Sequence, residues 1–242
     1  MIIRGIYHAH SRYSLDGTYT LSELKRMFIE RGFQFVIMTE HAEDLTPETY
    51  QAFYAECQKL SDTKFLFVPG LEVPYEGKVH VGCFPSGPTY AQVPLYGEGI
   101  SAMRAHGATT IYHHPSKQKY FMDDTFFSLL DGVEVWNSRY EGVYAPSRRT
   151  LAFARKHFAH LLHVGGLDLH RSSQFGGPCL EMDVPSLTTA HVHEALKKDA
   201  FNNVGRFYSY KKSDAQRLLR TLHYMCVRGI YELGRRIRNC MR

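Results

Sequence analysis

The chain has 242 residues and a net charge of +5, and 44% of its residues are hydrophobic and 22% charged. These proportions are those of a folded globular protein with room for one large α/β domain or two small domains. No apolar run is long enough to cross a membrane, and the N-terminus carries no secretory signal pattern.

The five cysteines are scattered along the chain and form no C-x-x-C pair. They are Cys57, Cys83, Cys179, Cys226 and Cys240. An odd and dispersed set is typical of reduced thiols in a cytoplasm, and it argues against a disulfide framework or a zinc site built from thiolates. We therefore expect a cytoplasmic protein with free cysteines.

Short runs rich in β-forming residues alternate with helical patterns along most of the chain. The predicted strands cover residues 5–10, 33–41, 64–73, 78–84, 109–115, 132–137 and 160–170. The predicted helices cover residues 20–32, 46–60, 99–106, 123–130 and 145–158. Strands that alternate with helices of this length indicate βα units and a mainly parallel sheet, either open or closed as a barrel.

The first two helices carry sequence signals at their ends. Thr20 and Glu23 have the spacing of a capping box, and Gly32 is placed to end the same helix. Thr46 is expected as the N-cap of the second helix, with Pro47 in its first turn. These signals predict where both helices begin.

The segment 206–242 is basic, whereas the rest of the chain is mildly acidic. It holds ten Lys or Arg against two acidic residues, a local excess of +8, so residues 1–205 sum to −3. Apolar residues recur in it at helical spacing: Leu218, Leu222, Met225, Cys226, Ile230, Leu233 and Ile237. We therefore expect residues 1–205 to form one domain and 206–242 an amphipathic basic helix. This helix would pack on the domain or project from it to an anionic surface, a nucleic acid or a partner protein.

Almost every predicted strand ends in a residue type that binds metals. In chain order these residues are His8, His10, His41, Glu72, His80, His113, His114, Asp168 and His170. The strand ends of a βα barrel share one face, where active sites are built, so these residues would converge there. The set is larger than the roughly four ligands of a single zinc ion. Nitrogen and oxygen ligands without sulfur suit Zn, Mn or Fe, and we expect two or three divalent metal ions.

The motifs that contain these residues resemble those of the polymerase and histidinol phosphatase (PHP) family of metal-dependent phosphoesterases. HAHSRYSLDG at 8–17 resembles the first family motif and MTEH at 38–41 the second. GLEV at 70–73, followed by HVG and HHP, resembles the third, and GLDLH at 166–170 the last. VEVWNSRY also resembles a segment of family members that act on nucleotides and small phosphate esters. Glu40 in the second motif stands where the family usually has Asp.

The resemblance implies a distorted, TIM-like (β/α)7 barrel with a trinuclear metal site, followed here by the basic C-terminal helix. The implied metal ligands are His8, His10, Asp16, His41, Glu72, His80, His114, Asp168 and His170. Glu72 would bridge two metals, and Glu72, Asp168 and His170 are the candidate catalytic residues. His114 is preferred to His113 because the family has a His directly before Pro, and His113 would then face the core or the substrate.

The implied chemistry is hydrolysis of a phosphate ester by a hydroxide that bridges two metals. Phosphate also needs protein cations, and four follow the predicted strand ends or the first motif closely. These candidate substrate contacts are Lys117, Arg139, Arg171 and Arg12. An Arg offers a two-pronged fork for phosphate oxygens, whereas a Lys acts as a point charge.

Several functions are compatible with this pattern. We expect a small phosphomonoester as substrate, such as a sugar, amino-alcohol or nucleoside phosphate, because the body is acidic and no clear second domain is present. The alternative within the family is a nucleotide phosphodiesterase or short-oligonucleotide exonuclease, which the basic tail favours. A non-catalytic PHP scaffold is a further alternative, although the ligand set is nearly complete. A hydrolase of C–N bonds on a related barrel would usually carry a bridging Lys at a strand end, and the sequence offers no persuasive one.

Overall fold

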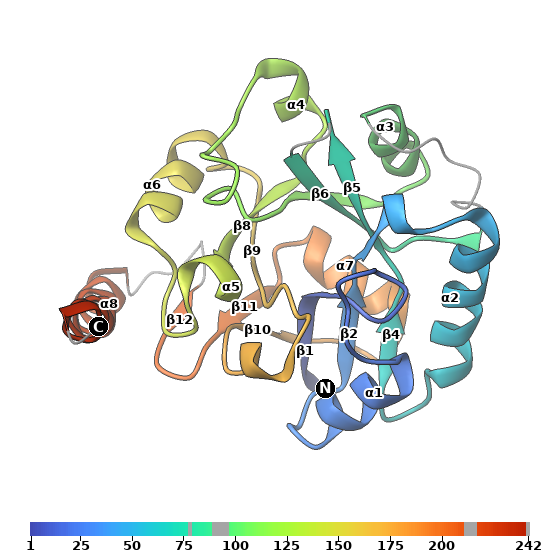
Figure 1. Ribbon diagram of the computed structural model, residues 1–242, viewed down its shortest axis with the longest axis horizontal. Helices are drawn as coiled ribbons and strands as arrows, with labels where there is room; N and C mark the ends of the chain where they lie inside the picture. Colours follow the sequence, from blue (N-terminus) through green and yellow to red (C-terminus); the bar gives the residue numbers. More distant parts are fainter. Residues whose placement is uncertain (77–78, 89–96, 211–216, 241–242) are drawn as a thin grey trace.

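The computed structural model describes residues 1–76, 79–88, 97–210 and 217–240, and in the last of these segments the side chains of 223–238. Strands occupy the middle of the molecule and most of the helices lie around them (Figure 1). The predicted α/β class is confirmed.

The strands form two sheets of six. The first has the order β12 (Ser209–Tyr210), β11 (Phe201–Val204), β10 (Cys179–Asp183), β1 (Ile2–Ala9), β2 (Phe35–Met38) and β4 (Leu66–Val68). The second has the order β3 (Glu40–His41), β5 (Leu71–Tyr75), β6 (Val79–Phe84), β7 (Thr109–Tyr112), β8 (Gly132–Asn137) and β9 (Leu162–Gly166).

The two sheets are connected in two places. The chain passes directly from β2 into β3 and from β4 into β5, so each of these pairs is one interrupted strand. On the other side, the segment after β9 runs parallel to β1, where Leu167 donates its N–H to the Tyr7 carbonyl at 3.0 Å and Leu169 donates to the His8 carbonyl at 3.1 Å. The carboxyl ends of β1 and β3, the first residues of β5 and the segment after β9 are thereby held close together.

The sheets are mixed, which corrects the prediction of a mainly parallel sheet. β6 runs antiparallel to both β5 and β7, because the short connection between β5 and β6 leaves no room for a crossover helix. Residues 171–205, to which the sequence analysis assigned no element, contain β10, β11 and a helix. β10 pairs antiparallel with β1 and adds three strands to that edge. Since β12 pairs with β11, the sheet continues past residue 205.

Eight α-helices are present among the described residues. They are α1 (Leu21–Ile29), α2 (Pro47–Leu60), α3 (Gly97–Ala105), α4 (Asp124–Ser128), α5 (Ser138–Glu141), α6 (Arg148–His157), α7 (Thr189–Lys197) and α8 (Arg217–Cys240). Short 3-10 helices cover Ala42–Asp44 and Ser172–Gln174. The capping box of α1 is confirmed, with Thr20 and Glu23 bonded reciprocally. Thr46 caps α2, whose first residue is Pro47.

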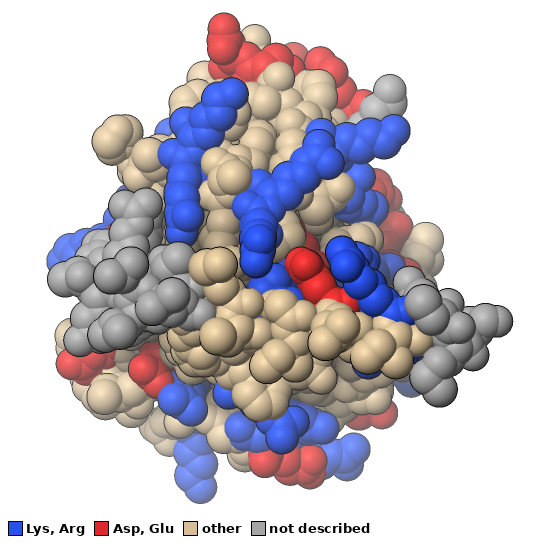
Figure 2. Space-filling view, turned by 90° about the vertical axis from the view of Figure 1, so that its left-hand side faces the viewer, with Lys and Arg blue, Asp and Glu red and all other residues tan. Residues whose placement is uncertain are grey.

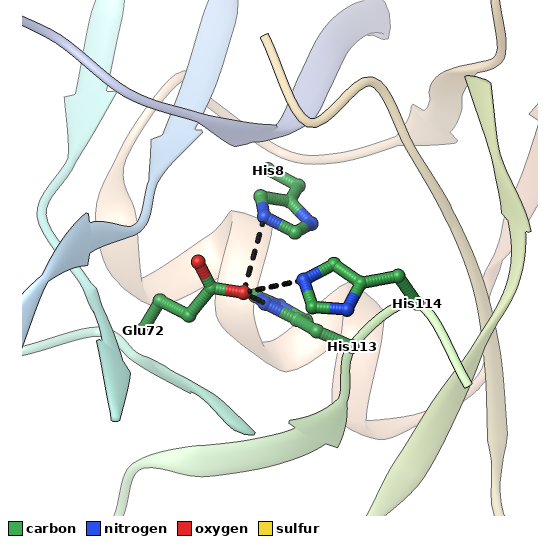
Figure 3. A group of neighbouring side chains, drawn as sticks. All are labelled: His8, Glu72, His113 and His114. Carbon is green, nitrogen blue, oxygen red and sulfur yellow. Dashed lines mark hydrogen bonds and ion pairs between the residues drawn. The ribbon is translucent and has the colours of Figure 1, made fainter. Parts of the chain in front are cut away.

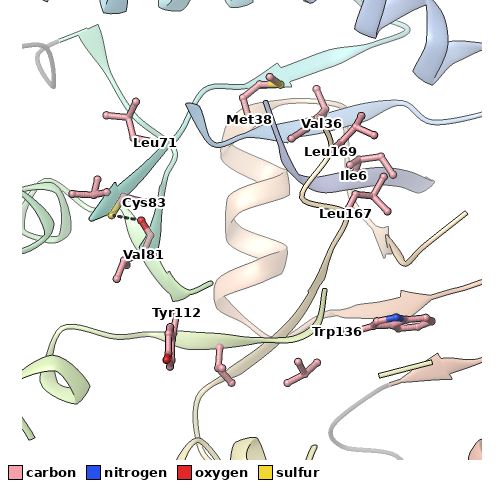
Figure 4. Close-up of a cluster of buried hydrophobic side chains, with 14 of the residues drawn as sticks. Ile6, Val36, Met38, Leu71, Val81, Cys83, Tyr112, Trp136, Leu167 and Leu169 are labelled. Atoms are coloured by element: carbon pink, nitrogen blue, oxygen red, sulfur yellow. Dashed lines mark hydrogen bonds between the residues drawn. The ribbon is translucent and has the colours of Figure 1, made fainter. Parts of the chain in front are cut away.

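Buried hydrophobic side chains form two clusters. The larger one fills the space between the strands and the outer helices, and Figure 4 shows Met38, Tyr112 and Trp136 within it. The second joins inward-facing strand residues to α7 through Val192 and Leu196. Both clusters pack against the strands and hold them in place. The polar residues of the strands are therefore carried by rigid elements.

The C-terminal helix α8 packs on the body through one face. Tyr224 donates its hydroxyl to the Pro146 carbonyl at 3.0 Å, and Arg228 donates to the carbonyls of Glu141 and Ala145 at 2.9 and 3.1 Å. Leu218 and Leu222, which the sequence analysis placed on the apolar face of this helix, lie outside the residues whose side chains the structure describes. Within the part of the chain that the structure describes, no helix combines the length and apolar character needed to cross a bilayer.

Glu141 is a buried residue that joins three helices through its carboxylate and its backbone carbonyl. It lies at the end of α5 and accepts hydrogen bonds from the Thr150 hydroxyl and, at 3.1 Å, from the Ser147 N–H at the start of α6. Its backbone carbonyl accepts the bond from Arg228 of α8. Burial raises the pKa of Glu141 to about 7.

This raised pKa predicts a pH-dependent contribution to stability. The folded state binds the proton of Glu141 more tightly than the unfolded chain, so the contribution is fully present below the usual pKa of 4.5 and is lost as the pH rises through about 7. Glu141→Gln should remove it, and the difference in unfolding free energy between wild type and variant should change by about 3 kcal/mol across this window. Denaturant unfolding at several pH values measures it, with Glu30→Gln on the surface as the control. A constant difference would contradict the prediction.

Candidate metal centre

The predicted metal-type residues come together, but not all of them lie at the carboxyl ends of strands as expected. Glu72 is the second residue of β5 and His80 the second residue of β6, because β4 and β5 are separated by a break in the strand and β6 runs antiparallel to β5. His8 and His10 lie at the end of β1, His41 on β3 and Glu72 on β5. The remaining members come from β6 and from the segments that follow β7 and β9: His80, His113, His114, Asp168 and His170. Residues separated by up to most of the chain length are thus within a few ångströms of one another, in four overlapping groups that could each hold a metal ion.

The carboxylate of Glu72 lies at the middle of these groups. Its Oε1 is 2.9 Å from Nε2 of His114 and 2.7 Å from Nδ1 of His113, with Nε2 of His8 at 3.5 Å (Figure 3). Nδ1 of His80 lies 3.1 Å from the same oxygen. The other oxygen faces Nδ1 of His41 at 3.1 Å and Nε2 of His10 at 3.6 Å. One carboxylate therefore faces six imidazoles, and its two oxygens address different groups.

Asp168 and Asp16 supply two further carboxylates to the cluster, and both lie next to His170. Asp168 Oδ1 lies 3.2 Å from Nδ1 of His170 and 3.8 Å from Nε2 of His10. Asp16 lies in the loop after β1, where its oxygens are 2.9 Å from Nε2 of His170 and 3.4 Å from Nε2 of His41. All nine predicted ligands are therefore brought together.

The donor atoms of this cluster fit bound metal ions. Five imidazole nitrogens and one carboxylate oxygen are buried without a hydrogen-bond partner among the described residues: His8 Nε2, His10 Nε2, His41 Nδ1, His80 Nδ1, His114 Nδ1 and Asp168 Oδ2. Leaving so many buried polar atoms unpaired is costly. Cations held by these atoms would remove that cost, and the mixed nitrogen and oxygen set suits Zn, Mn or Fe.

The backbone is strained at three of these residues. His8, His114 and Asp168 have φ angles of 67°, 29° and 53°, a region that side-chain-bearing residues seldom adopt. At His8 the pairing of β1 with β2 shifts register, which turns its side chain toward the cluster. Gly166 is required beside it, since a Cβ there would lie 2.9 Å from Cβ of His8 and 2.0 Å from Oε1 of Glu134. Strain of this kind collects at functional sites.

Glu134 is a site residue that the sequence analysis missed. Its carboxylate on β8 accepts from Nδ1 of His8 at 2.9 Å, from the backbone N–H of His114 at 2.7 Å and from Nδ2 of Asn137 at 2.8 Å. It is fully buried, and although burial opposes this, His8 holds the pKa of Glu134 below its usual value. A carboxylate behind a ligand His fixes its tautomer and ring orientation. The charged residue inside the buried strand GVEVWN was the available signal.

Glu40 supports the first motif from behind. It accepts hydrogen bonds from the backbone N–H of Ser11 at 2.9 Å and from the hydroxyls of Ser11 and Ser14, both at 2.6 Å. Burial raises the pKa of Glu40 to about 7. Through these hydrogen bonds, Glu40 fixes the loop that follows His10 next to the cluster.

Both His113 and His114 contact Glu72 in the cluster. Nδ1 of His113 lies 2.7 Å from Glu72, and its Nε2 lies 2.5 Å from the buried hydroxyl of Tyr7. Both nitrogens of His113 are therefore engaged, whereas Nδ1 of His114 has no partner among the described residues. Gly82 makes room for this pair, because a Cβ there would lie 2.1 Å from the His113 ring.

Burial and charge act in opposite directions on the imidazoles. Burial lowers the pKa of His8, but Glu134, Asp168 and Glu72 outweigh it and hold that pKa well above the usual value. Burial places the pKa of His10 well below its usual value. A neutral imidazole is the form that binds metal, so protons and metal ions compete at His8.

Of the four predicted substrate cations, Arg139 lies nearest the cluster. Its guanidinium is 3.3 Å from Oδ1 of Asp168 and 4.0 Å from Asp16, and it remains partly exposed. Nζ of Lys117 lies 5.5 Å from the ring centre of Tyr140, and that ring is 5.3 Å from His114. Arg139 is therefore in contact with the cluster, whereas Lys117 contacts Tyr140, whose ring lies next to His114.

The other two predicted cations lie on exposed loops. Arg12 donates to the Thr18 carbonyl within its own loop. Arg171 is exposed directly after His170, and its backbone N–H donates to Gln174. No contact between either guanidinium and the cluster occurs among the described residues.

Comparisons with known proteins find similarities of sequence and of fold. A family model described as the PHP domain matches residues 7–165. A comparison with curated proteins finds no match. Among solved structures, a two-domain protein from Bacteroides vulgatus that contains a predicted PHP-like metal-dependent phosphoesterase superposes with a TM-score of 0.66 at 16% identity, over 86% of this chain and 66% of that one.

Two further structures share the fold. PsfC from Pseudomonas syringae superposes with a TM-score of 0.62 at 15% identity, over 95% of this chain and 99% of PsfC. The lesion-specific endonuclease EndoQ from Pyrococcus furiosus superposes with a TM-score of 0.62 at 16% identity, over 86% of this chain. The chain spans 58% of the length of the endonuclease.

Proposed function

The chain belongs to the PHP domain family, and from this membership and the geometry of the cluster we propose that it is a metal-dependent hydrolase of phosphate esters. The observation that carries the proposal is the single buried carboxylate of Glu72, which faces imidazoles on both of its oxygens. That is the arrangement expected of a ligand shared between two metals. We also propose that the two connected sheets form the distorted seven-stranded barrel of this family.

The residues present define what each part of the site would do. His8, Glu72 and His114 would hold one metal, and His10, His41 and His170 belong to a second group. Bound divalent metals would lower the pKa of a water molecule, supply a nucleophile at neutral pH and offset charge on the phosphoryl group. The chain's own contribution is to fix the ligands through Glu134 and Glu40, and to place the Arg139 guanidinium where phosphate oxygens would lie.

We propose a small phosphomonoester as the substrate. Its support is the small number of cations at the site: Arg139 contacts the cluster, and Lys117 contacts the neighbouring Tyr140 ring. The second candidate is a nucleotide phosphodiester or short oligonucleotide, favoured by the fold shared with the endonuclease. A scaffold without activity fits poorly, because all nine residues of the implied ligand set lie together and six of their polar atoms make no hydrogen bond among the described residues. The cytoplasmic location stays a prediction.

Metal content and turnover test the proposed function together. The purified chain should retain two to three metal ions and hydrolyse an aryl phosphate monoester when Mn or Zn is added. Extraction with a chelator should remove the activity, and metal should restore it. Turnover of an aryl diester in preference to the monoester would favour the second candidate. A metal-free protein without turnover would favour the scaffold and contradict the proposal.

Replacing Arg139 by Ala should weaken substrate binding. A charged hydrogen bond contributes about 1.5–3 kcal/mol, so kcat/KM should fall about 10- to 100-fold, mainly through KM. Steady-state kinetics with the monoester measure this, and Lys59→Ala on the outer helix α2 is the matched control. Metal content must be measured alongside, because Arg139 also contacts Asp168. Unchanged kinetics with a full complement of metal would remove Arg139 from the site.

A further inference from the structure

The exposed side of α8 carries an apolar stripe, and Ile230 within it also lines a pocket with Tyr144 and Phe207. Ile230, Leu233 and Ile237 are 73%, 60% and 51% exposed, and Met225 is 49% exposed. The first three recur at spacings of three and four residues and therefore share one face of the helix. The opposite face is docked through Tyr224 and the other contacts described above. A contiguous exposed stripe of large aliphatic side chains marks an interaction surface.

Basic residues surround this stripe. Arg235, Arg236 and Arg238 are exposed on α8, and the described side chains of the helix include only one acidic group, Glu232. α6 adds further cations and contains no acidic residue: Arg148, Arg149, Arg155 and Lys156. Figure 2 looks onto this side of the molecule, where blue Lys and Arg side chains gather around a tan surface. We name the two helices together the α6/α8 face.

A pocket opens between the two helices of this face. It has a volume of about 300 Å³ and is lined by Arg148 and Arg155 from α6 and by Tyr224 and Met225 from α8, with Leu151 and Tyr208. Two guanidinium groups next to an apolar wall match a phosphate group attached to an aliphatic body, because each part then meets its complement.

We propose that the α6/α8 face binds the surface of a bilayer that contains anionic lipids. α8 lies in the interface with its apolar stripe among the acyl chains, and Arg148 and Arg155 contact a lipid phosphate in the pocket. A helix with an aliphatic face and an arginine-rich remainder is the usual form of such a surface anchor. Each arginine near an anionic leaflet strengthens binding about fivefold. This inference is independent of the reaction at the metal centre.

The charges favour this occupant over two others. A second copy would place one arginine-rich α8 against another, so the like charges would oppose pairing. A nucleic acid would satisfy the arginines but would leave Ile230, Leu233 and Ile237 in water. An anionic lipid surface accommodates both kinds of side chain at once.

Vesicle flotation of the full chain tests the proposal. The chain should float with vesicles of phosphatidylcholine mixed with phosphatidylglycerol and should stay unbound with phosphatidylcholine alone. Binding should weaken as salt is added. The double variant Ile230→Asp, Leu233→Asp should bind at least about tenfold more weakly, since the apolar insertion is lost. Both side chains are exposed, so the variant should keep the wild-type thermal melting and monoester turnover.

Two further variants separate charge from apolar contact. Arg148→Gln together with Arg155→Gln should weaken vesicle binding about 25-fold, at about fivefold for each arginine. Ile2→Asp, which removes an apolar side chain that is 71% exposed elsewhere, should leave binding unchanged. The proposal is overturned if wild type ignores both kinds of vesicle, if the stripe variant floats as well as wild type, or if the chain instead retains an oligonucleotide or forms a dimer that Leu233→Asp dissociates.

Discussion

Glu72→Gln is expected to abolish stable metal binding and to lower kcat/KM by at least about a thousandfold. The substitution keeps the shape of the side chain but removes the negative charge that six imidazole rings face. An amide offers one acceptor oxygen and cannot be shared between two cations as a carboxylate can. Metal-assisted charge stabilisation is worth several kcal/mol, which corresponds to a loss of this size. Elemental analysis and monoester turnover measure the two effects.

A matched control is available on the same hairpin. Glu76→Gln changes an exposed carboxylate just beyond β5 and should retain both metal and activity. Thermal unfolding of the Glu72→Gln variant and of wild type, both in chelator, separates lost metal binding from lost folding. If Glu72→Gln folds, binds metal and turns over substrate normally, a bridging role for Glu72 is wrong.

Glu134→Gln should weaken metal affinity about 10- to 100-fold while leaving every ligand in place. Its carboxylate accepts from Nδ1 of His8 and from the backbone N–H of His114, so it holds the orientation of two ligands at once. Loss of such a partner behind a ligand typically has an effect of this size. Competition with a metal-sensitive dye measures affinity, and kcat/KM at limiting metal should fall in parallel.

The diagnostic result for Glu134 is rescue by added metal. Because the substitution weakens binding without removing a ligand, saturating metal should recover most of the turnover, whereas it should not rescue Glu72→Gln. Glu98→Gln on the outer helix α3 serves as the control for removal of a carboxylate. Unchanged affinity in Glu134→Gln would show that His8 is oriented by other contacts.

The starts of the first two helices and the residues that form the cluster were the parts of this protein that the sequence could predict. The Thr20 and Glu23 pair marks the start of α1 because the capping bonds are made within four residues. The polar strand ends were visible because His and Glu interrupt runs of β-forming apolar residues. The family motifs then named Asp16, which lies in a loop and has no periodic signal.

Other features were hidden because they depend on partners distant in sequence. β6 runs antiparallel to both of its neighbours in the sheet. β10 pairs with β1, which precedes it by about 170 residues, so no local pattern reveals this pairing. Glu134 gave only the signal of a charged residue within a buried strand, since its role depends on His8, more than a hundred positions earlier, and on His114.

The sequence by itself determined which chemistry the chain can perform, because metal binding requires His, Asp and Glu side chains and the motifs contain them. The tertiary structure alone decided how that chemistry is arranged. It turned His8, His114 and Asp168 inward at positive φ, placed Arg139 at the cluster but left Arg12 in its own loop, and laid α8 down with its aliphatic face outward. Side-chain direction and exposure depend on long-range packing, which no local pattern contains.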